Sequence, residues 1–227
     1  MMRTGTNEVN MKPYVVAMTG ASGALYGVRL VQVLAELGFP VELIVSDPAK
    51  LVIREELKIP VRGLTREEDL IEIFGPGVKG CLKAYSPKDF TAPVASGSYP
   101  TAGMVIVPCS MGSLGAIASG VSQNLIHRAA DCILKEGRKL VLVPRETPLS
   151  AIHLENMLKL ARLGVAIVPA MPGFYSEAAS LSELVDFMAG KILDQLGIAH
   201  ALYPRWTGPH AGVGSSPDGT STINGPA

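Results

Sequence analysis

The chain has 227 residues, 48% of them hydrophobic, which is enough to bury one sizeable α/β core and too little for two full domains. Its 20 basic and 20 acidic side chains give a formal net charge of zero, which argues against a nucleic-acid-binding surface or an electrostatically held membrane partner. The three cysteines and four histidines lack the spacing of a disulfide framework or of metal ligands, so neither is expected.

The ends of the chain differ in composition from its middle. Residues 1–11 are polar and no apolar stretch approaches membrane-spanning length, so we expect a soluble protein of a reducing compartment, the cytoplasm. Residues 12–206 are expected to form the single folded domain. The segments 1–11 and 207–227, the latter rich in Gly, Pro, Ser and Thr, are expected to be disordered.

The first predicted strand, Tyr14–Met18, leads through the glycine turn Thr19–Gly23 into a helical pattern over Leu25–Leu37. Glycine permits a sharp turn and the close approach of an anion, and a helix N-terminus offers unpaired N–H groups. This favours a phosphate-binding turn over a turn that serves packing alone. The spacing fits neither a dinucleotide fingerprint, nor a nucleophile elbow, nor a Walker motif, so a mononucleotide is the expected ligand.

Strands that alternate with helices along the chain predict a parallel sheet. Gly38 and Pro40 end the first helix before an apolar run at Val41–Val45, which completes a βαβ unit. The region 58–99 predicts one helix and an irregular loop. Further strands are predicted at Met104–Val107, Leu140–Val143 and Val165–Val168, and helices at Leu125–Leu134, Ile152–Leu163 and Ser180–Leu196, the last with a capping box of Ser180 and Glu183.

Ligands of a doubly wound sheet bind outside the carboxyl ends of its strands, so the residues at the end of each strand form one candidate site. Ser110 and Ser113 are either donors to a flavin or phosphate or simple helix caps, and on their own they favour the cap. Cys109 favours a small buried thiol over a nucleophile.

Charged residues near the predicted strand ends leave two interpretations open. Arg145 and Glu146, between Pro144 and Pro148, form either a positioned site or an exposed turn with a weak ion pair. Arg128 and other cations of the neighbouring helix either serve a phosphate or cover a solvated face.

Eight blocks in order resemble the UbiX-type flavin prenyltransferases, and the resemblance extends from Tyr14 to about Trp206. The blocks are Thr19–Ala24, Ala95–Ser98, Pro108–Ser110, Asn124–Ile126 with Arg128–Asp131, Leu134–Glu136, Pro144–Pro148, His153–Met157 and Pro172–Tyr175. The resemblance implies a three-layer, flavodoxin-like (Rossmann-like) doubly wound parallel sheet. It also implies a single FMN-binding flavoprotein domain over 12–206 and a homo-oligomer, a dodecamer in the family.

The resemblance also implies an activity: transfer of a dimethylallyl group from dimethylallyl phosphate to N5 and C6 of reduced FMN, without a metal. The product, prenylated FMN, would serve UbiD-type decarboxylases. By the same resemblance FMN is held by Gly20, Ala21, Ser22, Ser46, Ser110, Met111, Gly112, Ser113 and Arg128. The prenyl phosphate is surrounded by Lys135, Arg145, Glu146, Tyr175 and Lys191, with Phe90 and Trp206 as aromatic walls.

Five residues carry the chemistry in this interpretation: Ser22, Glu56, Glu146, Arg145 and Lys135, with Glu56 as the acidic partner of Ser22. Lys191 stands where many relatives carry arginine, and Phe90 replaces a tryptophan. Ionising an allylic phosphate requires cations around the phosphate and aromatic faces around the prenyl cation, which these residues supply. Glu146 is expected to move protons. Two alternatives are an FMN-dependent aromatic acid decarboxylase and a flavin carrier without chemistry.

Overall fold

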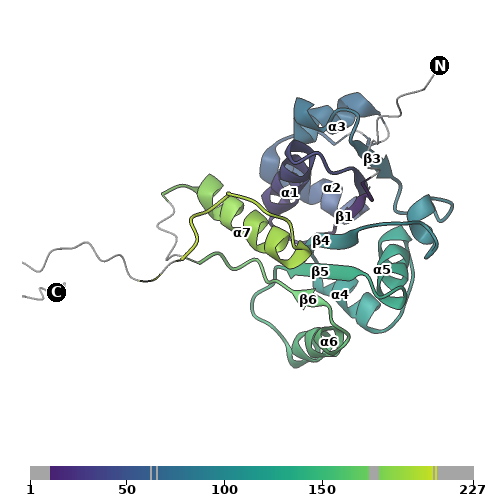
Figure 1. Ribbon diagram of the computed structural model, residues 1–227. Coiled ribbons are helices and arrows are strands. Elements are labelled where there is room, and N and C mark those ends of the chain that lie inside the picture. The colour runs from purple at the N-terminus through teal and green to yellow at the C-terminus, as the bar shows by residue number, and fades with distance from the viewer. Residues whose placement is uncertain (1–10, 62, 65, 174–178, 207, 209–227) are drawn as a thin grey trace, which may run out of the picture.

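The computed structural model describes residues 11–61, 63, 64, 66–173, 179–206 and 208, and within them the chain forms a six-stranded parallel sheet (Figure 1). The strands are β1 (Tyr14–Met18), β2 (Val41–Val45), β3 (Leu82–Tyr85), β4 (Gly103–Cys109), β5 (Lys139–Pro144) and β6 (Ala166–Ile167). Their order is β3-β2-β1-β4-β5-β6, and every neighbouring pair is parallel. The predicted doubly wound sheet is therefore confirmed, and without β3 the order is that of flavodoxin.

The strand β3 was not predicted. The region 58–99 contains one α-helix, α3 (Glu67–Phe74), as expected, and also the short 3₁₀ turns η1 (Pro76–Val78) and η2 (Pro93–Ala95). β3 has four residues at the edge of the sheet, none of them fully buried, and a strand this short and exposed shows no apolar run in the sequence.

Helices cover both faces of the sheet. On one face α1 (Ala24–Glu36), α2 (Asp47–Leu57), α3 and α7 (Leu181–Leu196) share a core with Val16, Leu43 and Val105. On the other, α4 (Met111–Ala118), α5 (Leu125–Lys135) and α6 (Ala151–Arg162) pack on alternate strand residues such as Ala17 and Ile106. Because side chains of a strand alternate between faces, the central strands are buried on both sides.

Helix α1 lies unusually close to the sheet. A Cβ atom at Gly27 would lie 2.5 Å from the carbonyl oxygen of Val107 and 2.7 Å from Cε of Met18. Only glycine fits there, and the close packing places the start of α1 over the ends of β1 and β4.

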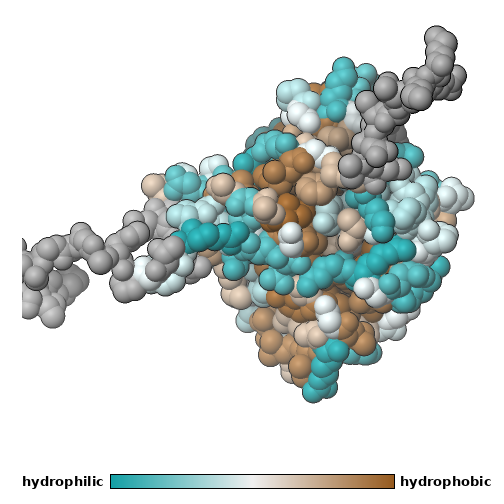
Figure 2. All heavy atoms as spheres, viewed as in Figure 1, coloured by the Kyte–Doolittle hydropathy of each residue, from teal (hydrophilic) through white to brown (hydrophobic). Residues whose placement is uncertain are grey.

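Helix α6 has an apolar outer side. Ile152, Leu154, Leu158 and Leu163 are each more than half exposed, and Figure 2 shows the corresponding brown area at the bottom of the view, where Figure 1 places α6. In α6 only Leu160 is buried. Exposed apolar surface of this kind typically marks a contact with another molecule.

The start of α7 corrects one local prediction. The Oγ atom of Ser180 accepts a hydrogen bond from the N–H of Glu183, as expected, but the Glu183 carboxylate accepts from Ala179 rather than from Ser180. The helix is therefore capped without the reciprocal bond of a capping box. None of the helices in the described part of the chain is long and apolar enough to cross a membrane.

Candidate active site

The candidate site lies where β1 and β4 run side by side and their chains leave toward opposite faces of the sheet. Thr19, only 2% exposed, joins the two strand ends. Its Oγ1 donates to the carbonyl of Pro108 (3.0 Å) and accepts from the N–H of Ser110 (2.7 Å). Sequence reasoning missed this role, and the only signal was a hydroxyl residue directly after a buried strand.

The N-terminus of α1 is capped by a carboxylate from another helix. Gly23, with φ of 107°, has no side chain to cap the helix, and Glu56 of α2 accepts from its N–H at 3.0 and 3.1 Å and from that of Ala24 at 2.8 Å. The carboxylate thus compensates the positive end of the helix dipole. These are the N–H groups that the sequence analysis expected to face a phosphate, so the anion at this turn is Glu56 itself.

Two further helices begin at the carboxyl ends of their strands, as α1 does. Ser46 caps α2 by accepting from the N–H of Ala49 (3.2 Å), and Ser110 caps α4 by accepting from that of Ser113 (3.3 Å). A Cβ at Gly112 would meet no atom within 4 Å, so the space over the first turn of α4 is open. The first turn of α4 thus has unfilled space beside Gly112, and its leading N–H groups are of the kind that bind anions.

Cys109 lies at the end of β4 with its side chain fully buried. Burial raises the pKa of this thiol to about 12, so it stays protonated at neutral pH. This confirms the expected buried thiol and excludes Cys109 as the nucleophile.

Arg145 joins the end of β5 to the first loop. Its Nε donates to the carbonyl oxygen of Ser22 at 3.4 Å, and since β4 lies between β1 and β5, the side chain crosses the end of β4. Arg145 is half-buried, whereas Glu146 is exposed and accepts from the N–H of Thr147 (3.0 Å). Of the two interpretations left open, the structure favours a positioned arginine.

A pocket of about 490 Å³ opens beside this arginine. Its lining combines the charged pair with apolar side chains: Pro144, Arg145, Glu146, Thr147, Leu149, Leu154, Met157, Pro169, Ala170 and Met171. An apolar pocket with a cation at its wall suits a ligand with a hydrocarbon chain and an anionic group.

Two predicted cations, Arg128 and Lys135, bind neighbouring groups of the protein. The Arg128 guanidinium donates to the carbonyl of Ala95 (2.9 Å) and to Asp131 (2.7 Å). Lys135 pairs with Glu136 (2.6 Å) at the end of α5, before β5 begins, whereas Arg145 follows β5. The intervening strand spans about 20 Å, so one chain does not bring Lys135 and Arg145 together.

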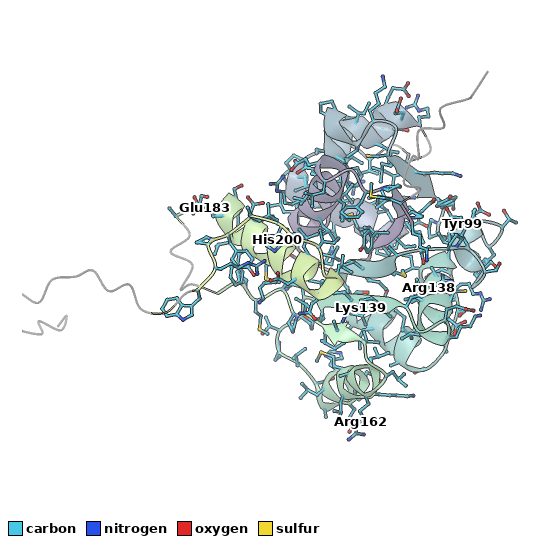
Figure 3. The ribbon with its side chains drawn as sticks, in the orientation of Figure 1. Tyr99, Arg138, Lys139, Arg162, Glu183 and His200 are labelled. Carbon is cyan, nitrogen blue, oxygen red and sulfur yellow. The ribbon has the colours of Figure 1, made fainter. Side chains whose placement is uncertain are left out.

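The loop beside Lys135 is held by another cation. Arg138 donates to the carbonyl oxygens of Gly97 (2.6 Å) and Tyr99 (2.8 Å), and Figure 3 labels Arg138 and Tyr99 on this part of the molecule. These contacts fix the loop that precedes β4 against the end of α5.

The remaining predicted residues differ in how exposed they are. Lys191 of α7 is half-buried, with Nζ 3.9 Å from Oδ2 of Asp194. Phe90 is 49% exposed in the loop after β3, and Trp206 is 68% exposed near the end of the described chain. Tyr175 falls outside the described residues, as do the segments predicted to be disordered apart from Met11 and Gly208. Among the described residues no group of His, Cys, Asp or Glu is arranged to hold a metal.

A doubly wound sheet with helix N-termini at the ends of its strands is typical of nucleotide-binding proteins, and flavoproteins are among them. The Flavoprotein family model matches residues 2–193. The chain is 53% identical to the flavin prenyltransferase UbiX of Halalkalibacterium halodurans, over 85% of this chain and 92% of that protein. The chain therefore belongs to the UbiX family of flavin prenyltransferases.

Solved structures agree with this assignment. A UbiX protein in complex with FMN and dimethylallyl pyrophosphate superposes with a TM-score of 0.77 at 39% identity, covering 88% of this chain and 99% of that one. A dodecameric FMN-dependent UbiX-like decarboxylase from Escherichia coli O157:H7 superposes with a TM-score of 0.75 at 43% identity, covering 86% and 100%.

Proposed function

We propose that the chain transfers a dimethylallyl group from dimethylallyl phosphate to N5 and C6 of reduced FMN, which gives prenylated FMN. Its family makes it a flavin prenyltransferase, and the observation that carries the proposal is Arg145, which reaches the Ser22 loop beside an apolar pocket. A related UbiX protein has been solved with FMN and dimethylallyl pyrophosphate, the two kinds of ligand this site suits.

The residues at the strand ends fit FMN. The open first turn of α4, with the hydroxyl groups of Ser110 and Ser113, suits the phosphate, and Ser46 adds a third hydroxyl at the start of α2. The loop Gly20–Ser22 packs closely on α2, because a Cβ at Gly20 would lie 2.5 Å from Cβ of Pro48. Reduced FMN, when bound, supplies the nucleophilic nitrogen and carbon that accept the prenyl group.

The chain's own residues would act on the prenyl donor. The Arg145 guanidinium stabilises the phosphate as the C–O bond breaks and the dianion leaves. The apolar wall of the pocket keeps water from the allylic cation. Glu146, exposed at the mouth of the pocket, would move the two protons that ring closure requires: one is added to the double bond of the prenyl group, and one leaves C6 of the flavin. Tyr175 and Lys191 complete the phosphate site in this proposal, and Phe90 and Trp206 its aromatic walls.

A role for Lys135 in the same site requires a second subunit, because in one chain this lysine lies at the opposite edge of the sheet. The exposed apolar side of α6 supports contacts between subunits. Since a relative from Escherichia coli is dodecameric, we propose a homo-oligomer, and a dodecamer in particular, for this chain.

The proposal includes a destination for the product. Prenylated FMN is a cofactor rather than an end product, so it must pass to an acceptor enzyme, and we propose a UbiD-type decarboxylase.

The three cysteines are free in the structure, which suits a reducing compartment such as the cytoplasm.

The test starts from the purified protein, incubated without oxygen with reduced FMN and dimethylallyl phosphate. We expect the extracted flavin to gain the mass of one five-carbon unit, and Arg145→Ala or Glu146→Gln to slow this gain. An unchanged flavin, with binding confirmed, would contradict the proposal. Because the Escherichia coli relative is described as a decarboxylase, carbon dioxide release from aromatic acids is measured in parallel. Release of carbon dioxide without any prenyl donor would support that second function. If the protein shows neither activity, a flavin carrier is the remaining interpretation.

A further inference from the structure

The segment 198–206, here called the strap, follows α7 and runs back along it (Figure 1). Gly197 adopts a left-handed conformation with φ of 72° and reverses the chain, and the N–H of Ile198 donates to the carbonyl of Leu193 (3.0 Å). The strap has no regular structure of its own. Its course therefore depends on side-chain contacts with α7, and Trp206 is its last residue.

Several of these contacts are made to the carboxylate of Asp194. Asp194 accepts two hydrogen bonds from the guanidinium of Arg205, at 2.7 and 2.8 Å, in a bidentate arrangement. The hydroxyl of Tyr203 donates to it at 2.6 Å, and Nε2 of His200 lies 3.3 Å from it. The pKa of Asp194 is held well below its ordinary value, chiefly by the hydrogen bonds from Arg205 and then by that from Tyr203.

The strap also fits α7 closely in shape. A Cβ at Gly190 would lie 2.5 Å from Cε1 of Tyr203 and 2.6 Å from Cε1 of His200, so these rings lie directly on the helix backbone. The His200 side chain is 2% exposed, and Figure 3 labels it over α7. The ring of Tyr203 packs on Phe187 with a centroid distance of 4.9 Å. The strap is thus held at one defined place on the helix.

Asp194 also lies near Lys191, which the resemblance assigns to the prenyl phosphate. Nζ of Lys191 lies 3.9 Å from Oδ2 of Asp194, three residues before it on α7. An ion pair this long is weak, so the lysine stays available to a phosphate. On its other side Asp194 holds Arg205, the neighbour of Trp206 in the chain. Asp194 therefore lies near Lys191 and binds the residue before Trp206. The resemblance gives both Lys191 and Trp206 contacts with the substrate.

We propose that Asp194 is a positioning residue, which holds Trp206 in place through Arg205 and, through the long ion pair, limits where the Nζ atom of Lys191 lies. The inference rests on the proposed function for the identity of the substrate. The contacts of Asp194 with the strap do not depend on that function. Asp194 itself touches neither ligand in this proposal. It holds one aromatic wall in place and limits where one phosphate-binding cation lies.

The first experiment uses FMN-loaded, full-length protein with Asp194→Asn, which keeps the size of the side chain and removes its charge. Trp206 is the only tryptophan of the chain, so intrinsic fluorescence reports on the strap. We expect faster loss of tryptophan anisotropy and a KM for dimethylallyl phosphate raised about tenfold, as the loss of charge-assisted hydrogen bonds implies. The kcat and the affinity for FMN change far less.

A matched control lies on the same helix. Asp186 has a similarly exposed side chain (24% against 23% for Asp194) and also pairs with an arginine, Arg29 of α1. Asp186→Asn therefore removes a comparable ion pair without touching the strap, and we expect wild-type anisotropy and KM. Equal effects of Asp186→Asn and Asp194→Asn would overturn the proposal, and so would wild-type values for both.

Two variants of Arg205 keep the test open if Asp194→Asn does not fold. Arg205→Ala is expected to reproduce the loss of anisotropy and the raised KM. Arg205→Lys keeps the charge without the bidentate contact and is expected to give intermediate values. If the wild type makes no prenylated FMN, the proposed function fails, and the anisotropy measurements alone then decide whether Asp194 holds the strap.

Discussion

At the scale of single residues, Glu56 joins two helices through the N–H groups at the start of α1. Glu56→Gln keeps an acceptor oxygen but removes the negative charge from the positive end of that helix. We expect the free energy of unfolding to fall by roughly 0.3–1 kcal/mol, measured by urea unfolding without ligand. Glu55→Gln is the control, because the exposed carboxylate of Glu55, next in the chain to Glu56, pairs with Arg54 on the surface. Equal stability of the two variants would refute this role for Glu56.

The lowered pKa of Asp194 predicts how the free energy of unfolding changes with pH. Its pKa is lower in the folded state than in the unfolded chain, so the folded state binds fewer protons at this site. The stabilisation is therefore complete above the unfolded pKa, near 4, and is lost as the pH falls further toward the folded pKa.

We expect the difference in unfolding free energy between the wild type and Asp194→Asn to be constant from pH 7 to about 5 and to shrink below about 4. Urea unfolding at several pH values measures it. A difference that stays the same down to pH 3 would show that the ion pair does not stabilise the fold.

The positions of single residues were predictable where a motif carries them and not elsewhere. The resemblance pointed to Glu56 and Arg145, and the structure places both beside the Ser22 loop. Thr19 and Asp194 were missed, since the bond from Thr19 spans 91 residues of sequence and the partners of Asp194 belong to a segment without periodicity. Such contacts arise only when the chain is folded.

At the scale of the elements, the distance between α1 and the sheet decides where the site lies. Gly27→Ala places a methyl group against the Val107 carbonyl, which cannot move without disturbing β4. We expect a loss of about 1–3 kcal/mol in unfolding free energy, measured by urea or heat. Gly115→Ala in α4 is the control, because its Cβ would meet only Asn156 at an ordinary 3.5 Å, and it should gain up to about 1 kcal/mol. Comparable losses in both variants would contradict this explanation.

Most elements were predictable from hydrophobic periodicity. The runs at Tyr14–Met18 and Val41–Val45 are strands with the predicted bounds, because both are buried on two faces. β3 escaped prediction because an exposed edge strand of four residues needs few apolar side chains. Register and strand order depend on packing between distant segments, so they came from the resemblance and the structure rather than from local pattern.

At the scale of the whole molecule, the separation of Lys135 from Arg145 predicts that the site is shared between subunits. Lys135→Ala and Arg145→Ala should each abolish most activity when assayed alone. Mixed oligomers of the two would contain some sites with both native residues, about a quarter if subunits mix at random. Recovery of prenyl transfer after co-expression measures this.

The corresponding control is the double variant, in which both substitutions lie on one chain. Mixed with wild type in equal amounts, it supplies neither residue and should not raise activity above that of the wild-type sites. Mixed oligomers of the single variants that stay inactive, with mixing confirmed by mass, would place both residues in one subunit's site or remove Lys135 from the chemistry.

The bonds that Thr19 makes to Pro108 and Ser110 have a consequence for the order in which the ligands bind. They join the loops that follow β1 and β4 into one preorganised surface, so little conformational entropy is lost when a flavin binds there. The Arg145 side chain reaches this surface through a hydrogen bond of 3.4 Å to the carbonyl oxygen of Ser22, which is longer than an ordinary N–H···O bond. We therefore expect an ordered mechanism. The flavin binds first, and the prenyl phosphate then draws the Arg145 side chain over it.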